Sequence, residues 1–95
     1  MEKQKFIVRC DRAGVFYGEI ERRQGQEVKM RNARCIWYWE GAATLLQLAA
    51  EGTTKPKECK FTITVDSLEV LDVIEIIPCT TKAIESIESV EEWKI

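Results

Sequence analysis

Apolar and polar positions alternate through the first third of the chain, with the two-residue period of a half-buried β-strand. The alternation runs over residues 6–10, 15–22 and 27–37. Residues that favour turns separate these runs at 11–14 and 24–26. The pattern therefore predicts three consecutive antiparallel strands joined by two hairpin turns.

The third of these runs changes phase half-way along. Val28 and Met30 share one parity, whereas Cys35 and Trp37 lie on the other. A strict period of two cannot place both pairs on one face of a sheet. We predict a β-bulge at Asn32, because one inserted residue restores the pattern. The alternative is that the second half of the run is buried on both faces.

Two later segments predict helices. Residues 41–51 carry apolar side chains at the spacing of one helical face. Apolar residues recur in the same way over 83–90, where Thr80 or Thr81 can cap the helix start. Trp93 is expected to fold back onto the sheet.

The remaining apolar runs predict further strands. Residues 61–65 alternate cleanly, 66–67 favour a turn or bulge, and 68–77 are rich in β-branched residues. Pro78 should end the last strand, because proline has no N–H to donate. Gly18, inside the second strand, suggests a bulge or a close approach of two backbones.

These elements predict one α+β domain over residues 1–95. We expect a small, twisted, mainly antiparallel sheet of about five strands, able to curl into a barrel-like form, with two short helices against it. The composition, 45% hydrophobic and 32% charged, is that of a globular domain. A domain of 95 residues buries a modest core, so we also expect a homo-oligomer.

Charge is unevenly spread along the chain, although the formal net charge is only −2. Residues 1–35 carry nine Lys and Arg against five Asp and Glu, and residues 36–95 carry five against eleven. This allows a basic face and an acidic face. The lack of a strong basic excess weighs against nucleic acid as a partner.

No targeting or membrane signal is evident. Residues 1–5 lead directly into the first strand, without the apolar stretch of a signal peptide. No run approaches the length of a membrane span. We therefore expect a cytoplasmic protein with no membrane partner.

The sequence offers little for catalysis. Histidine, the commonest general base, is absent, and neither a nucleophile elbow nor a phosphate-binding loop occurs. Glu69, Asp72 and Glu75 do not share one strand parity, which favours a solvated acidic edge over paired catalytic acids. We expect no enzyme activity, no catalytic residues and no cofactor.

The four cysteines predict buried, reduced thiols. They occur singly and lack the two-to-four-residue spacing of structural metal sites, so we expect no metal. Their positions are Cys10, Cys35, Cys59 and Cys79.

One cluster has the chemistry of a ligand site. Arginine forks and aromatic rings occur together over residues 31–39, and this combination binds planar or anionic ligands. A bulge at Asn32 can turn the two arginines toward one place. The alternative is that the tryptophans fill the core while the arginine stems cover apolar surface. The candidate ligand-binding residues are Arg31, Arg34, Trp37 and Trp39, with Tyr38 and Tyr17 as secondary candidates.

The predicted start of the first helix is a weaker candidate. Residues 40–43 could present free backbone N–H groups to an anion. The Glu40 carboxylate would repel that anion, so the favoured interpretation is that Glu40 or Gly41 simply caps the helix.

Four blocks carry a family resemblance: Asn-Ala-Arg at 32–34, Trp-Tyr-Trp at 37–39, Gly-Ala-Ala at 41–43 and Val-Ile-Glu-Ile-Ile-Pro-Cys-Thr at 73–80. They resemble a family of small proteins encoded by tailed phages and prophages, known as a domain of unknown function. The resemblance extends from about residue 14 to residue 93. It implies a phage or prophage origin and a compact accessory protein, and it supplies no activity.

Two functions fit such a protein. The first is a non-catalytic sponge that sequesters a cyclic nucleotide, or another phosphate-bearing small molecule, and so blocks a host defence signal. The central cluster offers the stacking rings and arginines that this requires. The rival is a protein–protein interaction module in phage assembly or host takeover. Either would act in the host cytoplasm.

Overall fold

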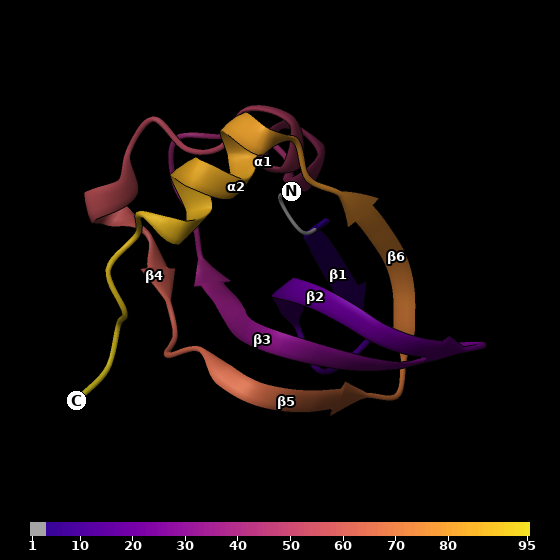
Figure 1. The fold of residues 1–95 in the computed structure, drawn as a ribbon. Helices are drawn as coiled ribbons and strands as arrows, with labels where there is room; N and C mark the ends of the chain where they lie inside the picture. Colours follow the sequence, from indigo (N-terminus) through magenta and orange to yellow (C-terminus); the bar gives the residue numbers. More distant parts are fainter. Residues whose placement is uncertain (1–3) are drawn as a thin grey trace.

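The computed structural model describes residues 4–95 and shows one antiparallel sheet with two α-helices (Figure 1). The predicted α+β class is confirmed. Residues 1–3 lie outside the described residues, and with them most of the N-terminal stretch in which no signal peptide was expected. The elements are β1 (Phe6–Cys10), β2 (Val15–Gln24), β3 (Glu27–Tyr38), α1 (Leu45–Glu51), a 3₁₀ turn η1 (Pro56–Glu58), β4 (Lys60–Phe61), β5 (Val65–Val70), β6 (Val73–Pro78) and α2 (Thr81–Glu88).

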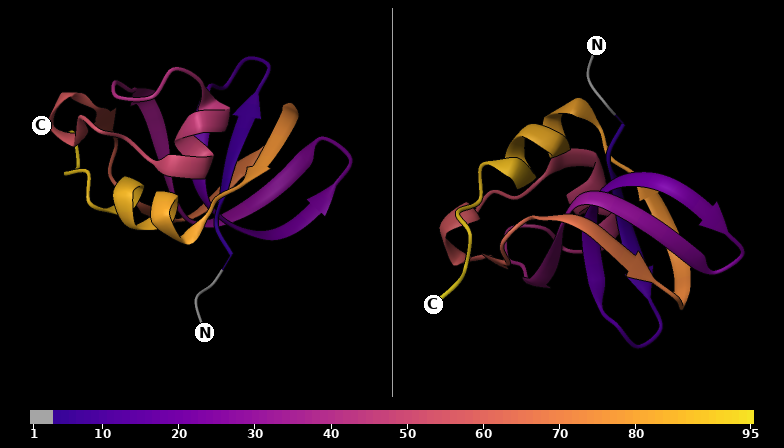
Figure 2. Two further views of the ribbon diagram at one scale, coloured as in Figure 1. Left: turned by 90° about the horizontal axis from the view of Figure 1, so that it is seen from above. Right: turned by 60° about the horizontal axis from the view of Figure 1, so that its bottom comes forward.

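The sheet has the order β4-β3-β2-β1-β6, and β5 also pairs with β3. The long strand β3 is therefore bordered by β2 on one side, and by β5 and then β4 on the other. The sheet curls strongly without closing, as Figures 1 and 2 show. The chain passes directly from β5 to β6, although β5 pairs with β3 and β6 pairs with β1.

The curl buries both faces of the central strands. Ile7 and Val8 are neighbours in β1 whose side chains point to opposite faces, and both are fully buried. Ile7 joins a cluster of side chains between the sheet and the helices. Val8 joins a second cluster inside the curl, where β5 and β6 contribute Val70 and Val73. The fold thus has one core on each side of β1.

The bulge predicted at Asn32 is confirmed. The register between β2 and β3 shifts there, so that Asn32 and Ala33 together face Gly18. Asn32 has a φ of +50°, the one left-handed conformation among the described non-glycine residues. A Cβ atom on Gly18 would lie 2.9 Å from Ala33 Cα. The predicted close backbone approach at Gly18 is therefore also present.

The two helices lie side by side over one end of the sheet (Figure 2). Thr80 caps α2 as predicted, because its hydroxyl accepts a hydrogen bond from Ala83 N at 3.1 Å. The same threonine ties the helices together, since its hydroxyl donates to Ala50 O at 2.7 Å. No helix within residues 4–95 is long and apolar enough to cross a membrane.

The predicted start of the first helix is wrong. Helix α1 begins at Leu45, and Thr44 caps it by accepting from Gln47 N. Gly41 has a left-handed φ of +83°, which ends any helical path through this position. Neither Glu40 nor Gly41 is a cap, and the anion site considered at 40–43 has no helix start beneath it.

The predicted strands over 61–65 and 68–77 are also corrected. Strand β4 ends at Phe61, β5 begins at Val65, and the chain turns at 71–72 rather than at 66–67. The turn is needed because β5 pairs with β3 whereas β6 pairs with β1. Asp72, a residue type that favours turns, stands at this break, but it does not say which strands β5 and β6 pair with.

Cross-strand pairing also changes the charge picture. Arg9 in β1 pairs with Glu75 in β6 at 2.9 Å, and Arg22 in β2 lies 3.9 Å from Glu69 in β5. The acidic C-terminal strands thus lie among the basic N-terminal strands, so these charges offset one another across the sheet.

Candidate functional site

Arg34 lies inside the protein and is only 5% exposed. Its position after the bulge turns the side chain toward the helix side of the sheet, where the guanidinium lies 5.4 Å from the Phe61 ring centre. Burial lowers the pKa of Arg34, against the opposing effect of nearby acidic groups. The environment is therefore a solvent-poor one that a charged group tolerates only when it is well paired.

The pairing of Arg34 is complete. A guanidinium has five N–H donors, and in Arg34 all five donate to main-chain carbonyl oxygens. These carbonyls belong to the end of β4 and the residue after it, the C-terminal end of α2, and the segment that follows α2. A cation at the C-terminal end of a helix also interacts favourably with the helix dipole. The accepting residues are Thr62 at 3.0 Å, Val90 at 3.1 Å, Phe61 at 3.2 Å, Ile87 at 3.3 Å and Glu91 at 3.5 Å.

Tyr17 and Arg34 line one polar hollow of about 310 Å³ together. The buried Tyr17 hydroxyl donates to Glu88 Oε2 at 2.7 Å. The Lys5 ammonium lies 3.2 Å from the same carboxylate and 3.4 Å from Glu19. Desolvation raises the pKa of Tyr17, and its hydrogen bond to Glu88 adds to this shift. The hollow holds a paired network that fixes α2 to the sheet.

Arg31 lies earlier along β3, where its side chain is exposed. Its guanidinium is 3.5 Å from Glu21, and it lines a different hollow with Glu19 and Asn32. The predicted convergence of Arg31 and Arg34 on one place is therefore not observed. The end of α2 and the segment after it cover Arg34, whereas nothing in the described residues covers Arg31 in this way.

The tryptophans also separate. Trp37 is 65% exposed and stacks on Trp93, with ring centres 6.0 Å apart and planes 24° from parallel. Lys60 lies 5.5 Å above the Trp93 ring. Trp39 is half-buried against the helix-side core, and its indole N–H donates to Ala42 O at 3.1 Å. One indole is thus a surface group and the other is partly structural.

Tyr38 is the last residue of β3, so by alternation its side chain leaves the opposite face of the strand from Trp37. It is exposed, and its hydroxyl donates to Glu40. That hydrogen bond raises the pKa of Tyr38. Tyr38 contributes to none of the hollows that the other candidate residues line.

Two apolar hollows adjoin on the Trp37 side of the sheet. One, of about 250 Å³, is lined by both Trp37 and Trp39. The other, of about 180 Å³, opens over the inner core. Cys35 lines both hollows. We call this surface the indole face, defined by Cys35, Trp37, Trp39, Ile63, Val65 and Trp93.

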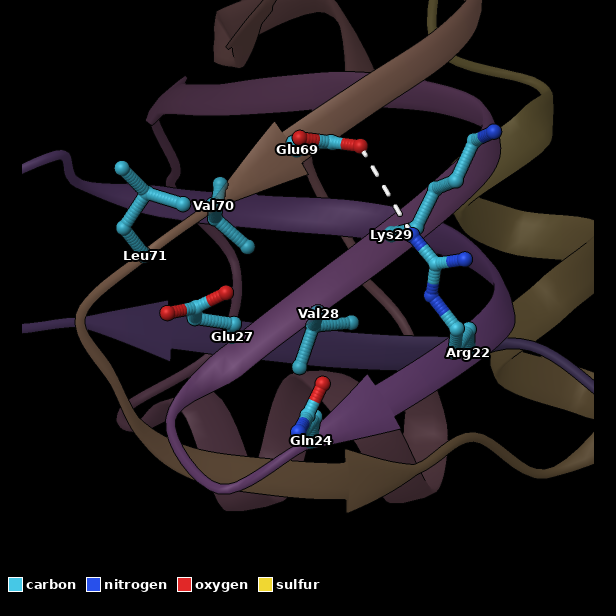
Figure 3. Close-up of a pocket in the computed structure, with 8 residues that line it drawn as sticks. All are labelled: Arg22, Gln24, Glu27, Val28, Lys29, Glu69, Val70 and Leu71. Carbon is cyan, nitrogen blue, oxygen red and sulfur yellow. Dashed lines mark ion pairs between the residues drawn. The ribbon is translucent and has the colours of Figure 1, made fainter.

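A further hollow lies at the far end of the β2–β3 hairpin (Figure 3). Its lining includes Arg22 and Glu69, whose side chains lie 3.9 Å apart across the opening. Its volume of about 50 Å³ is that of one or two water molecules. This hollow is too small for a nucleotide or a peptide.

The cysteines form no reactive centre within the described residues. All four are free; three are buried, and Cys35 is half-buried. Burial raises the pKa of Cys10 and of Cys79 to about 11, so both are neutral thiols at physiological pH. Residues 4–95 contain no group of three metal-ligating side chains.

Comparison with known proteins identifies the family. A family model described as a domain of unknown function (DUF6948) matches residues 3–87. The chain belongs to this family. No curated protein and no solved structure matches it. Membership of DUF6948 confirms the resemblance to an uncharacterised family and leaves the function to be argued from geometry.

Trp93 and Lys60 were missed as site residues. Trp93 was expected to fold back onto the sheet, and its N–H does donate to Phe61 O at 2.8 Å. Its contact with Trp37 depends on the C-terminal tail running beside β4, which no local pattern encodes. Trp93 also lies beyond the stretch that the DUF6948 model matches.

Proposed function

We propose that this chain is a non-catalytic binding module that recognises another protein through the indole face. The observation that carries the proposal is the stack of Trp37 on Trp93, in which two large rings remain 65% and 45% exposed. Tryptophan is strongly enriched among the residues that dominate binding energy at protein interfaces. Exposed rings beside apolar hollows are typical of such surfaces.

The indole face is also well prepared for binding. Stacking holds Trp37 and Trp93 against each other, and the N–H bond to Ala42 holds Trp39. Rings that are already positioned lose little conformational freedom when a partner docks. Lys60 lies over the Trp93 ring, and Glu92, the residue before Trp93, pairs with Lys94, so charges of both signs adjoin the stack.

The biological setting is part of the proposal. The blocks at 32–43 and 73–80 resemble proteins of tailed phages and prophages. We place this chain among phage accessory proteins that act in the host cytoplasm, during assembly or host takeover. A second copy of the chain is one protein that the indole face could bind, which would make it a homo-oligomer.

Sequestration of a nucleotide-like ligand is the second candidate. One observation favours it, namely that Trp37 and Trp39 line the same hollow and could stack on a base. Arg34 cannot bind the phosphate without leaving its carbonyls, and Arg31 is paired with Glu21. The phosphate of the nucleotide would need another cation. The candidate is Arg12, which directly precedes Ala13 and Gly14 in the lining of this hollow.

The main test compares capture of partners from phage-infected host cells. Tagged wild type, Trp37→Ala and Leu71→Ala would be used, because Leu71 is 67% exposed and lies outside the indole face. We expect a partner that wild type and Leu71→Ala retain, and that Trp37→Ala recovers at least about tenfold less. Equal recovery by all three would contradict the proposal.

The two candidates separate in a thermal-shift screen. Cyclic di- and trinucleotides should leave the melting temperature of a protein-binding module unchanged. A saturable rise that Trp37→Ala and Arg12→Ala both abolish would favour sequestration instead.

A further inference from the structure

The chain continues beyond α2 as a short segment, residues 89–95, that we call the tail (Figure 1). Glu92 of the tail forms a parallel bridge with Phe61 of β4, and Trp93 N donates to Phe61 O at 2.8 Å. Pairing of main-chain groups at the edge of a sheet is the way in which many domains bind an extended peptide. The tail thus occupies the edge of β4 as a bound peptide would.

The Glu92 carboxylate has a place of its own beside this edge. Its Oε2 atom accepts from Thr64 N at 3.0 Å. Burial lowers the pKa of Arg34, and the negative charge of Glu92 counteracts this effect, so the carboxylate also stabilises the buried guanidinium. The edge therefore offers a main-chain N–H and a positive charge to an acidic residue.

The Trp93 ring has a second place on the same surface. It stacks on Trp37 with ring centres 6.0 Å apart, and the Lys60 ammonium lies 5.5 Å from its centre. Another ring and an ammonium both attract the face of an aromatic side chain. A segment in which an acidic residue directly precedes an aromatic residue therefore matches this surface at two neighbouring positions.

The tail is held by these contacts rather than by the core. The helix-side core ends in the chain at Val90, and residues 91–95 are all exposed. A segment that fully buries no apolar side chain opens locally at a small fraction of the free energy of global unfolding. The tail can therefore leave the edge of β4 while the domain stays folded.

We propose that β4 and Trp37 form a peptide-binding site of which the tail is the built-in occupant, an inference that rests on the proposed function. The partner protein offers an extended segment in which Glu or Asp directly precedes an aromatic residue. This segment takes the place of the tail, with its carboxylate on Thr64 N and its ring on Trp37. Trp37 thus binds the partner, whereas Trp93 competes with it.

The contacts of the tail select this chemistry over other segments. A residue without a side-chain acceptor in place of the acid would leave Thr64 N without its partner, and a basic residue would lie near Arg34. An aliphatic residue in place of the ring would lose the stack on Trp37 and the contact with Lys60. An acid followed by a ring keeps all of these contacts.

The attachment of the tail sets the affinity expected of a free peptide. A segment joined by a short linker competes at an effective concentration of roughly millimolar. Since the tail occupies the site, a free peptide of the same sequence should bind the vacated site with a Kd of about 0.1–1 mM.

The test is a titration of the full chain with the capped peptide Glu-Glu-Trp-Lys-Ile, followed by NMR. The double variant Glu92→Ala/Trp93→Ala removes the two anchors of the tail, both of them exposed, and so vacates the site. We expect saturable shifts of the Thr64 amide and Trp37 indole N–H signals in this variant, and about two- to tenfold weaker binding in wild type, whose tail competes. The control peptide, capped Glu-Ala-Ala-Lys-Ile, should shift neither signal. No saturable shift in the double variant at several millimolar peptide, or equal affinity in wild type, would overturn the inference.

Two further substitutions in the double variant check the contact with the ring. Trp37→Ala should weaken peptide binding about three- to tenfold, because the stack is lost. Leu71→Ala is the matched control, since Leu71 is exposed in the turn between β5 and β6 and should leave the affinity unchanged. Equal affinity in both would contradict the proposed place of the ring.

Hydrogen exchange tests the release of the tail in wild type, without any substitution. The Trp93 amide, which donates to Phe61 O, should exchange at least about a hundredfold faster than the Met30 amide in the centre of the sheet. Equal protection of the two amides would mean that the tail is released only when the whole domain unfolds, and the tail would then not be displaceable.

Capture from infected cells separates this inference from the proposed function. Trp93→Ala should recover about two- to tenfold more partner than wild type, because the competitor is removed, whereas Trp37→Ala recovers less. If both variants recover less, the proposed function stands and this inference falls, since the tail is then part of the interface. If the peptide binds while Trp37→Ala recovers as much partner as wild type does, the peptide site stands and the proposed function falls.

Discussion

Arg34 and Trp37 lie three positions apart in β3, yet the fold uses them in opposite ways. Arg34 is buried, and all five of its N–H donors are occupied by carbonyls of the protein itself. Trp37 is largely exposed, and its ring stacks on Trp93. The sequence alone had placed both in a single ligand site.

The difference shows that residue type alone does not decide whether a side chain is structural or available for binding. What covers that face of the strand decides it. After the bulge at Asn32, alternate positions point to the helices or away from them. Ile36 faces the helix-side core, so Trp37 faces away from it. A cation on the helix side meets the carbonyl ends of α2, and a ring on the other side meets solvent. Ordinary alternation along β3 therefore separates a structural arginine from an exposed ring.

The largest expected effect is that of Arg34→Met. It removes the guanidinium and leaves several buried carbonyls without donors, so we expect a loss of about 3 kcal/mol or more in the free energy of unfolding. Arg31→Met is the matched control, because an exposed ion pair contributes less than about 1 kcal/mol. Urea denaturation of both variants measures the contrast. Similar losses in the two variants would remove the distinction between a structural and a surface arginine.

Much of the fold could be predicted from the amino-acid sequence alone. The phase change in the third run located the bulge at Asn32, Gly18 marked the close backbone approach, and Thr80 marked the start of α2. Each is a local rule, because it depends on a few adjacent residues. The break at 71–72 was missed, because it depends on which strands β5 and β6 pair with.

The site was harder to predict than the fold, for a physical reason. Whether an arginine binds a ligand depends on which acceptors surround it, and those around Arg34 come from residues 61–62 and 87–91. One signal did exist, since the second half of β3 was considered as buried on both faces. Taken further, that alternative would have placed Arg34 inside.

Alkaline unfolding tests the buried side through Cys79, which lies in the helix-side core. Burial raises its pKa from 9.0 to about 11. The unfolded chain therefore loses this proton first, and stability present below pH 9 is lost as the pH rises toward 11. We expect the free energy of unfolding to fall between pH 8 and pH 10.5 by roughly 2 kcal/mol more in wild type than in Cys79→Ala.

The control for this experiment is Leu46→Ala, an exposed α1 change that leaves every thiol in place. It should show the full wild-type pH dependence in the same denaturation series. Identical pH dependence in wild type and Cys79→Ala would mean that this thiol is not held neutral by the core.

A smaller effect is expected for Tyr17→Phe in the polar hollow. The substitution keeps the ring in the core and removes only the hydroxyl that donates to Glu88. Because Glu88 keeps Lys5 and solvent as partners, we expect a loss of about 1 kcal/mol. Thermal denaturation measures it, and binding at the indole face should be unchanged. A loss of partner binding in this variant would show that the two regions are coupled.

The smallest effect concerns the indole face itself. Trp37→Ala and Trp93→Ala should each cost less than about 1 kcal/mol of folding free energy, because both rings are already exposed. A double-mutant cycle isolates their contact, for which an exposed stacked pair predicts a coupling of about 0.5 kcal/mol, the lower end of the range for aromatic pairs. In binding, Trp37→Ala should weaken partner capture far more than its stability loss explains. A large stability loss with proportionate loss of binding would instead make Trp37 a structural residue like Arg34, and the contrast between the two sides of β3 would disappear.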